Sequence, residues 1–188
     1  MDGNLAYQEE PRTELLDGRI VMMSSPSINH NRTAGNIYHI FRNYLKGKKC
    51  EAFSDGVDVY LTENDRTIPD AMIVCSKDII QKDGIHGAPD LVVEVLSPST
   101  AKNDRGYKKD LYEKSGVKEY WIVDPNMRSI EAYLLFDGKY ILDGFYGLFP
   151  DAFGFTEKER TESKKEIQVS FYDDFCIPLE EIFCNLFQ

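Results

Sequence analysis

Positive charge is scarce in this 188-residue sequence. Lysine and arginine together number 22 against 32 aspartates and glutamates, so the formal net charge is -10 and the pI is about 4.8. Proteins that bind nucleic acids broadly and without sequence preference usually carry a basic surface, because they neutralise phosphates. The composition argues against that class, although it leaves room for a local basic patch on an acidic surface.

Cysteine is also sparse. The four cysteines are Cys50, Cys75, Cys176 and Cys184; no two are in CxxC spacing, and no histidine accompanies a pair at zinc-finger spacing. We therefore expect small buried hydrophobic side chains with free thiols, and no zinc site. Free thiols are typical of the cytoplasm.

Long hydrophobic runs and the marks of an export signal are missing as well. No apolar stretch approaches the ~20 residues of a membrane-spanning helix, and the start of the chain, MDGNLAYQEE, has neither a basic beginning nor an apolar centre. We expect a cytoplasmic protein with no membrane segment. With 42% hydrophobic and 29% charged residues, the composition suits one globular domain over residues 1–188.

Strand and helix patterns alternate along the chain. Helices are predicted over 27–47, after a Ser27 cap, over 100–116 and over 177–187, and a polar loop over 156–166. The predicted strands fall within 14–23 (two, around an Asp17-Gly18 turn), 50–62 (two, joined at Asp55-Gly56), 66–75, 88–96, 118–125 and 129–146 (a hairpin turning at Asp137-Gly138). This order predicts an α/β (α+β) fold, a mixed β-sheet flanked by helices.

Two of the predicted core strands each carry an acidic residue among apolar ones. Glu94 lies in the apolar run 91–96, and Asp70 lies in the run 68–74. Burying a lone ionised carboxylate is costly, so such a group is normally paired, protonated or bound to a metal. Because side chains alternate along a strand, Asp70 and Glu94 could meet if the two strands are neighbours.

Such a meeting would make a hard oxygen site. The carboxylates of Asp70 and Glu94, the backbone carbonyl of Val95 and a third carboxylate from Glu14 would suit Mg²⁺ or Mn²⁺. A cation of this kind can activate water and neutralise a phosphate. The alternatives stay open: Asp70 could be a strand-end residue bonded to backbone, and Glu94 could pair with a lysine or arginine.

Three segments together resemble the Uma2 family, also called DUF820 or putative restriction endonuclease. They are ELLDGRIVMMSSPSINH (14–30), IPDAMIV (68–74) and PDLVVEVLSPSTAKNDRGYKKDLYEKSGVKEYWIVDP (89–125), and the resemblance spans about residues 14–140. It implies a restriction-endonuclease-like core of the PD-(D/E)XK nuclease class, with Mg²⁺ or Mn²⁺ as cofactor and DNA as substrate. Related nucleases often act as dimers on duplex DNA, so it also implies a possible homodimer.

The resemblance assigns roles to individual residues of the strands. Asp70 matches the aspartate of the PD motif, and Glu94 matches the acidic residue of the second half-motif. Val95 would be the residue whose carbonyl faces the metal. The lysine that should follow is replaced by Leu96, a departure from the motif. Glu14 matches the family's early glutamate, an expected extra ligand of the metal or of water.

A lysine from the following helix is expected to take the missing role. Lys108 matches the family's helical lysine, and we expect it to orient the water or stabilise charge on the phosphate. Tyr112 lies one turn further on the same face. Lys102 and Lys109 are the alternatives, with solvated surface positions as their ordinary role.

A few other polar residues could have a role in the site or in local structure. His30, at the start of the first long helix, could touch the site or bond to backbone. Asp104 could cap a helix through its side chain. Ser97 and Ser99 could contact metal-bound water, or make turn hydrogen bonds around Pro98.

The function predicted is a Mg²⁺-dependent endonuclease that hydrolyses phosphodiester bonds of DNA. A second hypothesis is a catalytically idle or weak family member that binds a protein or nucleic acid, which the acidic charge and Leu96 favour. A third is a metal-dependent hydrolase of a smaller phosphodiester. A working nuclease requires Asp70, Glu94 and a lysine to converge in one cleft, whereas a binding module does not.

Overall fold

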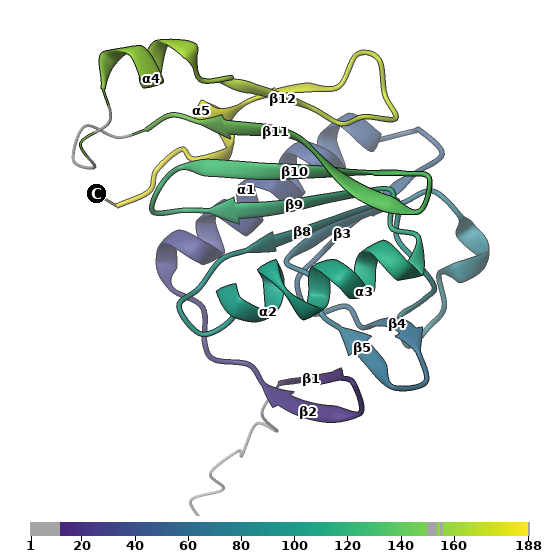
Figure 1. Cartoon of the computed structure of the whole chain (residues 1–188). Helices are drawn as coiled ribbons and strands as arrows, with labels where there is room; N and C mark the ends of the chain where they lie inside the picture. The colour runs from purple at the N-terminus through teal and green to yellow at the C-terminus, as the bar shows by residue number, and fades with distance from the viewer. Residues whose placement is uncertain (1–11, 150–153, 155, 188) are drawn as a thin grey trace, which may run out of the picture.

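The computed structural model describes residues 12–149, 154 and 156–187. Its centre is a six-stranded mixed sheet with strand order β11-β10-β9-β8-β6-β3, in which β8 and β9 are parallel and the other pairs antiparallel. Figure 1 shows helices α2 and α3 in front of this sheet and α1 behind it. The strands are β3 (Glu51–Ser54), β6 (Ala71–Val74), β8 (Leu91–Val95), β9 (Glu119–Asp124), β10 (Ser129–Phe136) and β11 (Lys139–Gly147); the helices are α1 (Ile28–Leu45), α2 (Ala101–Arg105) and α3 (Tyr107–Ser115).

The middle strands of the sheet are apolar throughout because both of their faces are covered. All five residues of β8 are buried, as are the first five of β9, and the two strands are joined by the crossover through α2 and α3. Ile73, Val93 and Trp121 pack toward Phe41 of α1. The alternate residues pack toward α3, in a cluster formed by Val92, Leu96, Tyr112, Val117, Tyr120 and Ile122.

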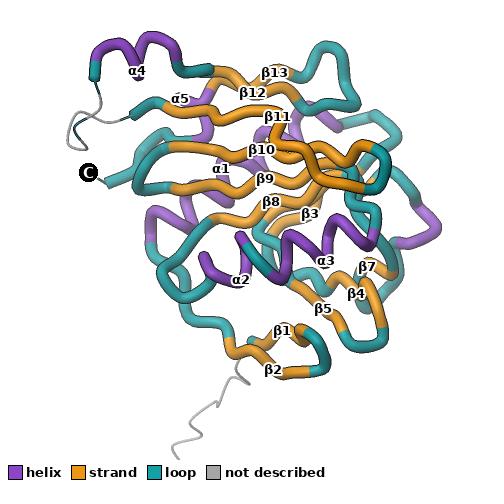
Figure 2. Tube along the Cα trace, in the orientation of Figure 1, coloured by secondary structure: helices purple, strands orange, loops and turns teal. Residues whose placement is uncertain are grey.

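A second, smaller sheet lies beside α3. Its strand order is β2-β1-β5-β4-β7, with β4 and β7 parallel. Figure 2 shows β1 and β2 at one end of the molecule, and the β12–β13 pair beside β11 at the other. The remaining elements are β1 (Thr13–Leu16), β2 (Arg19–Met22), β4 (Val59–Thr62), β5 (Asp65–Thr67), η1 (Lys77–Ile79), β7 (Ile85–His86), α4 (Glu157–Glu162), β12 (Glu166–Gln168), β13 (Cys176–Pro178) and α5 (Leu179–Ile182).

Several element predictions are confirmed. The turn at Asp17-Gly18 joins β1 to β2, and the Asp137-Gly138 turn joins β10 to β11. Ser27 caps α1 by accepting a hydrogen bond from the backbone N–H of His30 at 3.2 Å. Gly116, in the left-handed conformation, ends α3. In the described part of the chain, no helix is long and apolar enough to cross a membrane.

Four predicted elements are different in the structure. The helix predicted over 177–187 is reduced to α5, of four residues, and its first two positions belong to strand β13. The single strand predicted over 66–75 divides at Pro69 into β5 and β6, which join different sheets, because proline cannot donate to a ladder. The helix over 100–116 breaks at Gly106, where a Cβ would lie 2.9 Å from the Lys102 carbonyl oxygen. The polar segment 156–166 contains α4, a short helix whose sequence has no apolar stripe to reveal it.

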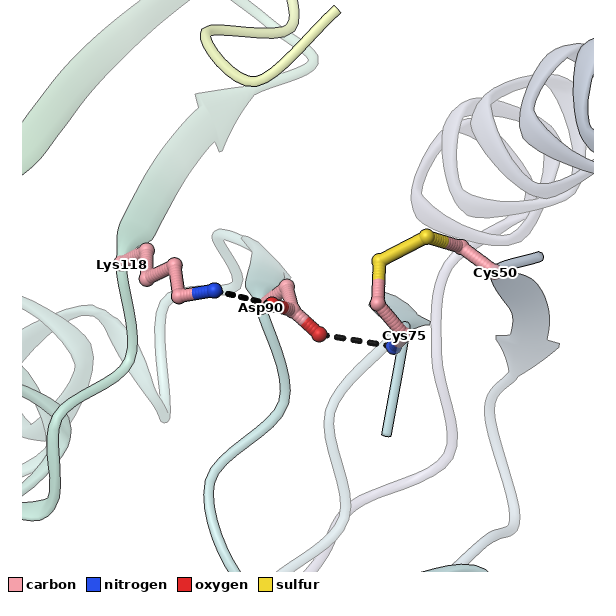
Figure 3. Close-up of a disulfide and its surroundings, with 4 residues drawn as sticks. All are labelled: Cys50, Cys75, Asp90 and Lys118. Carbon is pink, nitrogen blue, oxygen red and sulfur yellow. Dashed lines mark hydrogen bonds and ion pairs between the residues drawn. A yellow bond between two sulfur atoms is a disulfide. The ribbon is translucent and has the colours of Figure 1, made fainter. Parts of the chain in front are cut away.

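The prediction of free, buried cysteines is confirmed only in part: Cys50 is buried but not free, and Cys176 and Cys184 are free but not buried. Cys50 and Cys75 form a disulfide, shown in Figure 3, and the free Cys176 and Cys184 are exposed. The cause is the antiparallel register of β3 and β6, which pairs Glu51 with Val74. Cys50 precedes Glu51 and Cys75 follows Val74, so the two cysteines lie opposite each other. One of the two arguments for a cytoplasmic location, the free thiols, therefore fails for this pair.

Candidate functional site

The two acidic residues of the core strands meet as predicted. Strands β6 and β8 are neighbours, and the pairing of Ala71 with Val93 brings Asp70 beside Glu94. The carboxylate of Asp70 accepts a hydrogen bond from the backbone N–H of Val95 at 2.7 Å. Asp70 thus bonds to backbone, as one interpretation proposed, and it also lines the pocket that Glu94 lines.

Lys108 lies at the floor of this pocket and joins carboxylates from two sheets. Its Nζ is 2.7 Å from Oε1 of Glu94 on β8 and 2.9 Å from Oε1 of Glu14 on β1. Asp104, one helical turn earlier, places Oδ1 at 3.6 Å. Glu14 Oε1 also accepts the backbone N–H of Ile68 at 2.9 Å, so the small sheet is fixed against the segment that leads through Asp70 into β6.

Tyr112 makes a second contact from α3 to Glu94. It follows Lys108 by one turn on the same face of α3, as predicted, and its hydroxyl donates to Oε1 of Glu94 at 2.6 Å. The side chain is fully buried. Glu94 is therefore held by a lysine and a tyrosine that leave one helix together.

Buried carboxyl groups outnumber the buried ammonium in the pocket and directly beneath it. The carboxylates of Glu14, Asp70, Glu94 and Asp104 are buried, with 1% to 7% of each residue exposed, and Lys108, at 2%, is the buried ammonium among them. Removing charged groups from water is costly unless they are compensated. This excess of carboxylates favours a site that accepts a further cation.

The pKa directions follow from this crowding. Burial raises the pKa of Glu94 well above its usual value; Lys108 opposes the shift, while Asp104, Asp70 and Glu14 add to it. Burial would lower the pKa of Lys108, but Glu94, Glu14 and Asp104 outweigh it, so the pKa rises well above the ordinary value. Burial also raises the pKa of Asp104. The neighbouring carboxylates therefore make it harder for Glu94 and Asp104 to ionise.

His30 stands at the rim of the pocket, beside Asp70. Its Nε2 lies 3.4 Å from Oδ2 of Asp70. Burial disfavours the imidazolium, but the hydrogen bond and charge of Asp70, with contributions from the Val95 backbone and Asp55, outweigh burial and raise the pKa of His30. The imidazole ring of His30 therefore lines the pocket, as one of the two interpretations proposed. The backbone N–H of His30 donates to the side chain of Ser27, which caps the helix.

Four hydroxyl groups lie together next to the rim. Ser97 Oγ is 3.0 Å from both Ser99 Oγ and Thr100 Oγ1, and Ser99 Oγ is 3.0 Å from Ser24 Oγ. Ser97 and Thr100 also exchange bonds with each other's backbone N–H, which confirms the turn predicted there. Ser24, Ser97 and Thr100 line the pocket.

Some residues singled out in the sequence lie elsewhere. Leu96, at the position of the motif's lysine, packs in the apolar cluster under α3. Lys109 lies over the ring of Tyr133 at 3.7 Å, and Lys102 is not among the described residues that line the pocket. The prediction that Asp104 caps a helix is wrong: it lies inside α2, whose N-cap is Thr100, and its carboxylate faces Lys108 at 3.6 Å.

The sequence interpretation missed Arg12 and Asp55. Both line the pocket, and their side chains form a two-bonded ion pair at 2.8 and 2.5 Å. One signal was present: Arg12 stands two residues before Glu14, a spacing that puts two side chains on the same side of an extended chain. Asp55 gave no signal, because Asp-Gly is typical of a turn and was interpreted as one.

The pocket offers the oxygen ligands that the expected metal prefers. Asp70, Glu94 and the Val95 carbonyl offer hard oxygen atoms, and Glu14 adds a carboxylate nearby. Among the described residues, no three histidine, cysteine or acidic side chains are already arranged as metal ligands. Mg²⁺ is usually held by one or two carboxylates together with water and substrate phosphates, so this donor set and its excess negative charge fit Mg²⁺ or Mn²⁺.

Comparison with known proteins agrees with the fold. The profile of the Uma2 family, described as "Putative restriction endonuclease", matches residues 4–164. Two curated proteins of Synechocystis sp. (strain ATCC 27184 / PCC 6803 / Kazusa) are similar. Uncharacterized protein slr1290 is 32% identical over 69% of this chain and 70% of its own length, and uncharacterized protein sll1609 is 25% identical over 67% and 73%.

A solved structure extends the comparison to nearly the whole chain. It is a crystal structure described as a putative nuclease belonging to DUF820, from Anabaena variabilis ATCC 29413. It superposes with a TM-score of 0.65 at 18% identity, covering 93% of this chain and 91% of that one. The expected fold class, a mixed sheet flanked by helices, is confirmed.

Proposed function

Because this chain belongs to the Uma2 family, we propose that it is a Mg²⁺- or Mn²⁺-dependent endonuclease that hydrolyses phosphodiester bonds of DNA. One observation carries the proposal: the carboxylates of Asp70 and Glu94 converge with Lys108 in one pocket. The family's printed description and the nuclease described in the similar crystal structure support the reaction class.

The strand residues are assigned to the cation. In the proposal, Asp70, Glu94 and the Val95 carbonyl hold it, and Glu14 serves as a further ligand of the metal or of water. When bound, such a cation supplies positive charge beside the phosphate and acidifies a water molecule. The hydrogen bond from the Val95 N–H fixes one oxygen of Asp70, which limits how its carboxylate can turn.

Lys108 is the proposed substitute for the lysine missing at Leu96. It lies between Glu14 and Glu94, so it fixes both carboxylates and counters the rise in the pKa of Glu94. Tyr112 fixes the same oxygen of Glu94 from the same helix. In this role Lys108 favours the ionised form of Glu94 and positions both carboxylates, and it places positive charge close to where the phosphate would react.

The proposal is tested by cleavage of supercoiled plasmid and of single-stranded DNA in Mg²⁺ and in Mn²⁺. The variants are Asp70→Asn, Glu94→Gln and Lys108→Met. We expect cleavage by wild type and a loss of about a hundredfold or more in each variant.

Asp90→Asn is a matched control for Asp70→Asn. Asp90 is also buried and also accepts a backbone N–H, that of Cys75, at 2.7 Å (Figure 3). It is not among the residues that line the pocket. We expect it to cleave at the wild-type rate. A folded wild type that cleaves neither DNA in either metal, or an Asp70→Asn variant as active as Asp90→Asn, would contradict the proposal.

A homodimer is part of the proposal, since a two-fold axis suits cleavage of both strands of a duplex. Light scattering at the concentrations used for cleavage tests it. A monomer mass in an active sample would contradict this part alone.

A further inference from the structure

The lysine on the floor of the pocket is too enclosed to bind a substrate phosphate directly. Lys108 is 2% exposed, and its ammonium has three acidic side chains around it. Glu14 and Glu94 lie 2.9 and 2.7 Å from the ammonium, and the more distant Asp104, at 3.6 Å, adds a third negative charge beside it. Within the described part of the pocket, the other side chains able to carry positive charge are Arg12 and His30.

Arg12 is placed differently. Its side chain is 43% exposed, and it lines the same pocket as Glu14, Asp70 and Glu94. Asp55 accepts from Nη1 and Nη2, which uses two of the five N–H donors of the guanidinium. A planar guanidinium can bind a carboxylate along one edge and present donors to a phosphate along another.

Backbone hydrogen bonds hold Arg12 and Asp55 in place beside the acidic site. The N–H of Asp55 donates to the carbonyl oxygen of Asp70 at 3.0 Å, and the N–H of Met23 donates to that of Arg12 at 2.9 Å. The two bonds to Asp55 therefore fix the guanidinium at the mouth of the acidic pocket.

From this placement we propose that Arg12 binds a non-bridging phosphate oxygen of the nucleic-acid backbone at the mouth of the pocket. The inference rests on the proposed nuclease function and names the side chain that receives its substrate. A polyanion approaching these carboxylates needs a cation to meet it, and Arg12 is the exposed one that the pocket offers. Asp55 holds the guanidinium and balances its charge until the substrate arrives.

The test is the salt dependence of oligonucleotide binding, measured by fluorescence anisotropy with Ca²⁺ in place of Mg²⁺. A phosphate contact adds ~0.9 to the slope of log affinity against log salt for duplex DNA, and ~0.7 for single strands. For Arg12→Gln we expect a slope smaller by about that amount and an affinity about tenfold or more lower, as a charged hydrogen bond is lost. Arg12→Lys should keep the slope and recover part of the affinity, because lysine keeps the positive charge but lacks the planar set of donors of the guanidinium.

Arg105→Gln is the matched control. Arg105 is also paired with one carboxylate, Glu131, and its side chain is 47% exposed, but it does not line the pocket. We expect it to keep the wild-type slope. If Arg12→Gln impairs folding, as judged by circular dichroism, Arg12→Lys is compared with Arg105→Lys, and a loss of affinity confined to Arg12→Lys supports the proposal.

The outcomes separate the two proposals. Wild-type slope and affinity in Arg12→Gln, or an equal loss in Arg105→Gln, overturns the role of Arg12, while cleavage by the wild type would leave the nuclease standing. A wild type that neither binds the oligonucleotide nor cleaves DNA overturns both.

Discussion

Lys108 Nζ lies 2.7 Å from Oε1 of Glu94, and both side chains are buried, one on helix α3 and the other near the end of strand β8. Glu14 approaches the same ammonium from the smaller sheet. The contact therefore connects the two sheets as well as forming the floor of the pocket. Its removal should affect both the stability of the fold and the chemistry.

Lys108→Met should destabilise the protein by about 3–5 kcal/mol at neutral pH, because it leaves buried carboxylates without their partner. Burial raises the pKa of Glu94, so its ionised form is disfavoured in the folded state. That penalty is absent below the unfolded pKa, ~4.3, and grows as the pH rises above it. The destabilisation should therefore shrink as the pH falls toward that value, as measured by urea unfolding across a pH series.

Lys118→Met is the control for this experiment. Lys118 is also 2.7 Å from a carboxylate, that of Asp90, but its side chain is 65% exposed. Exposed pairs contribute at most about 1 kcal/mol. Equal losses in the two variants would contradict a buried and uncompensated cluster.

Tyr112→Phe should cost more stability than Tyr120→Phe. Both tyrosines are fully buried, but Tyr112 donates to the carboxylate of Glu94 and Tyr120 to the backbone carbonyl of Asp104. A hydrogen bond to a charged group contributes about 1.5–3 kcal/mol and one to a neutral group about 0.5–1.5. Chemical denaturation at neutral pH compares the two, and a smaller loss in Tyr112→Phe would argue that Glu94 is protonated there.

Asp65 should give a second pH dependence, of opposite sign. Burial would raise its pKa, but hydrogen bonds from the Asp17 N–H, Thr62 and Tyr107 outweigh burial and lower it. A lowered pKa contributes stability above the unfolded value, and this is lost as the pH falls through the folded value. Tyr107→Phe removes one donor, so NMR titration should find the Asp65 pKa higher than in wild type. An unchanged value would show that the tyrosine bond is not formed in solution.

The disulfide between Cys50 and Cys75 should stabilise the fold. It closes a loop with a sequence separation of 25 residues, for which the chain-entropy model gives about 3.5 kcal/mol. Urea unfolding of a Cys50→Ser, Cys75→Ser double variant should show a loss of that order, and Cys176→Ser, at an exposed free thiol, little change. Thiol titration of the denatured, unreduced protein should find two of the four cysteines reactive; four reactive thiols would contradict the bond.

The parts of the site that follow from alternation could be predicted from the sequence. A glutamate in the apolar run of β8 and an aspartate before β6 were expected to share a face, and the strands are neighbours as that required. Lys108 came from the family resemblance, since no local pattern marks a surface-type residue for burial. Its place depends on where α3 packs, which is a tertiary property.

The rest depended on pairings between distant parts of the chain. The ion pair of Arg12 with Asp55 and the disulfide of Cys50 with Cys75 follow from which strands are neighbours and in which register. The division of the predicted strand at Pro69 sends its two halves to different sheets. A sequence shows a strand's pattern, but its partner is chosen by the packing of the whole core.

The central claim is that the carboxylates of Asp70 and Glu94 hold a divalent cation. Calorimetric titration of Mn²⁺ into wild type, Asp70→Asn, Glu94→Gln and the Asp90→Asn control tests it most directly. The account predicts saturable binding by wild type and Asp90→Asn, weakened about tenfold or more in the two site variants, since each loses a charged ligand. Equal Mn²⁺ affinity in wild type and Asp70→Asn would contradict it.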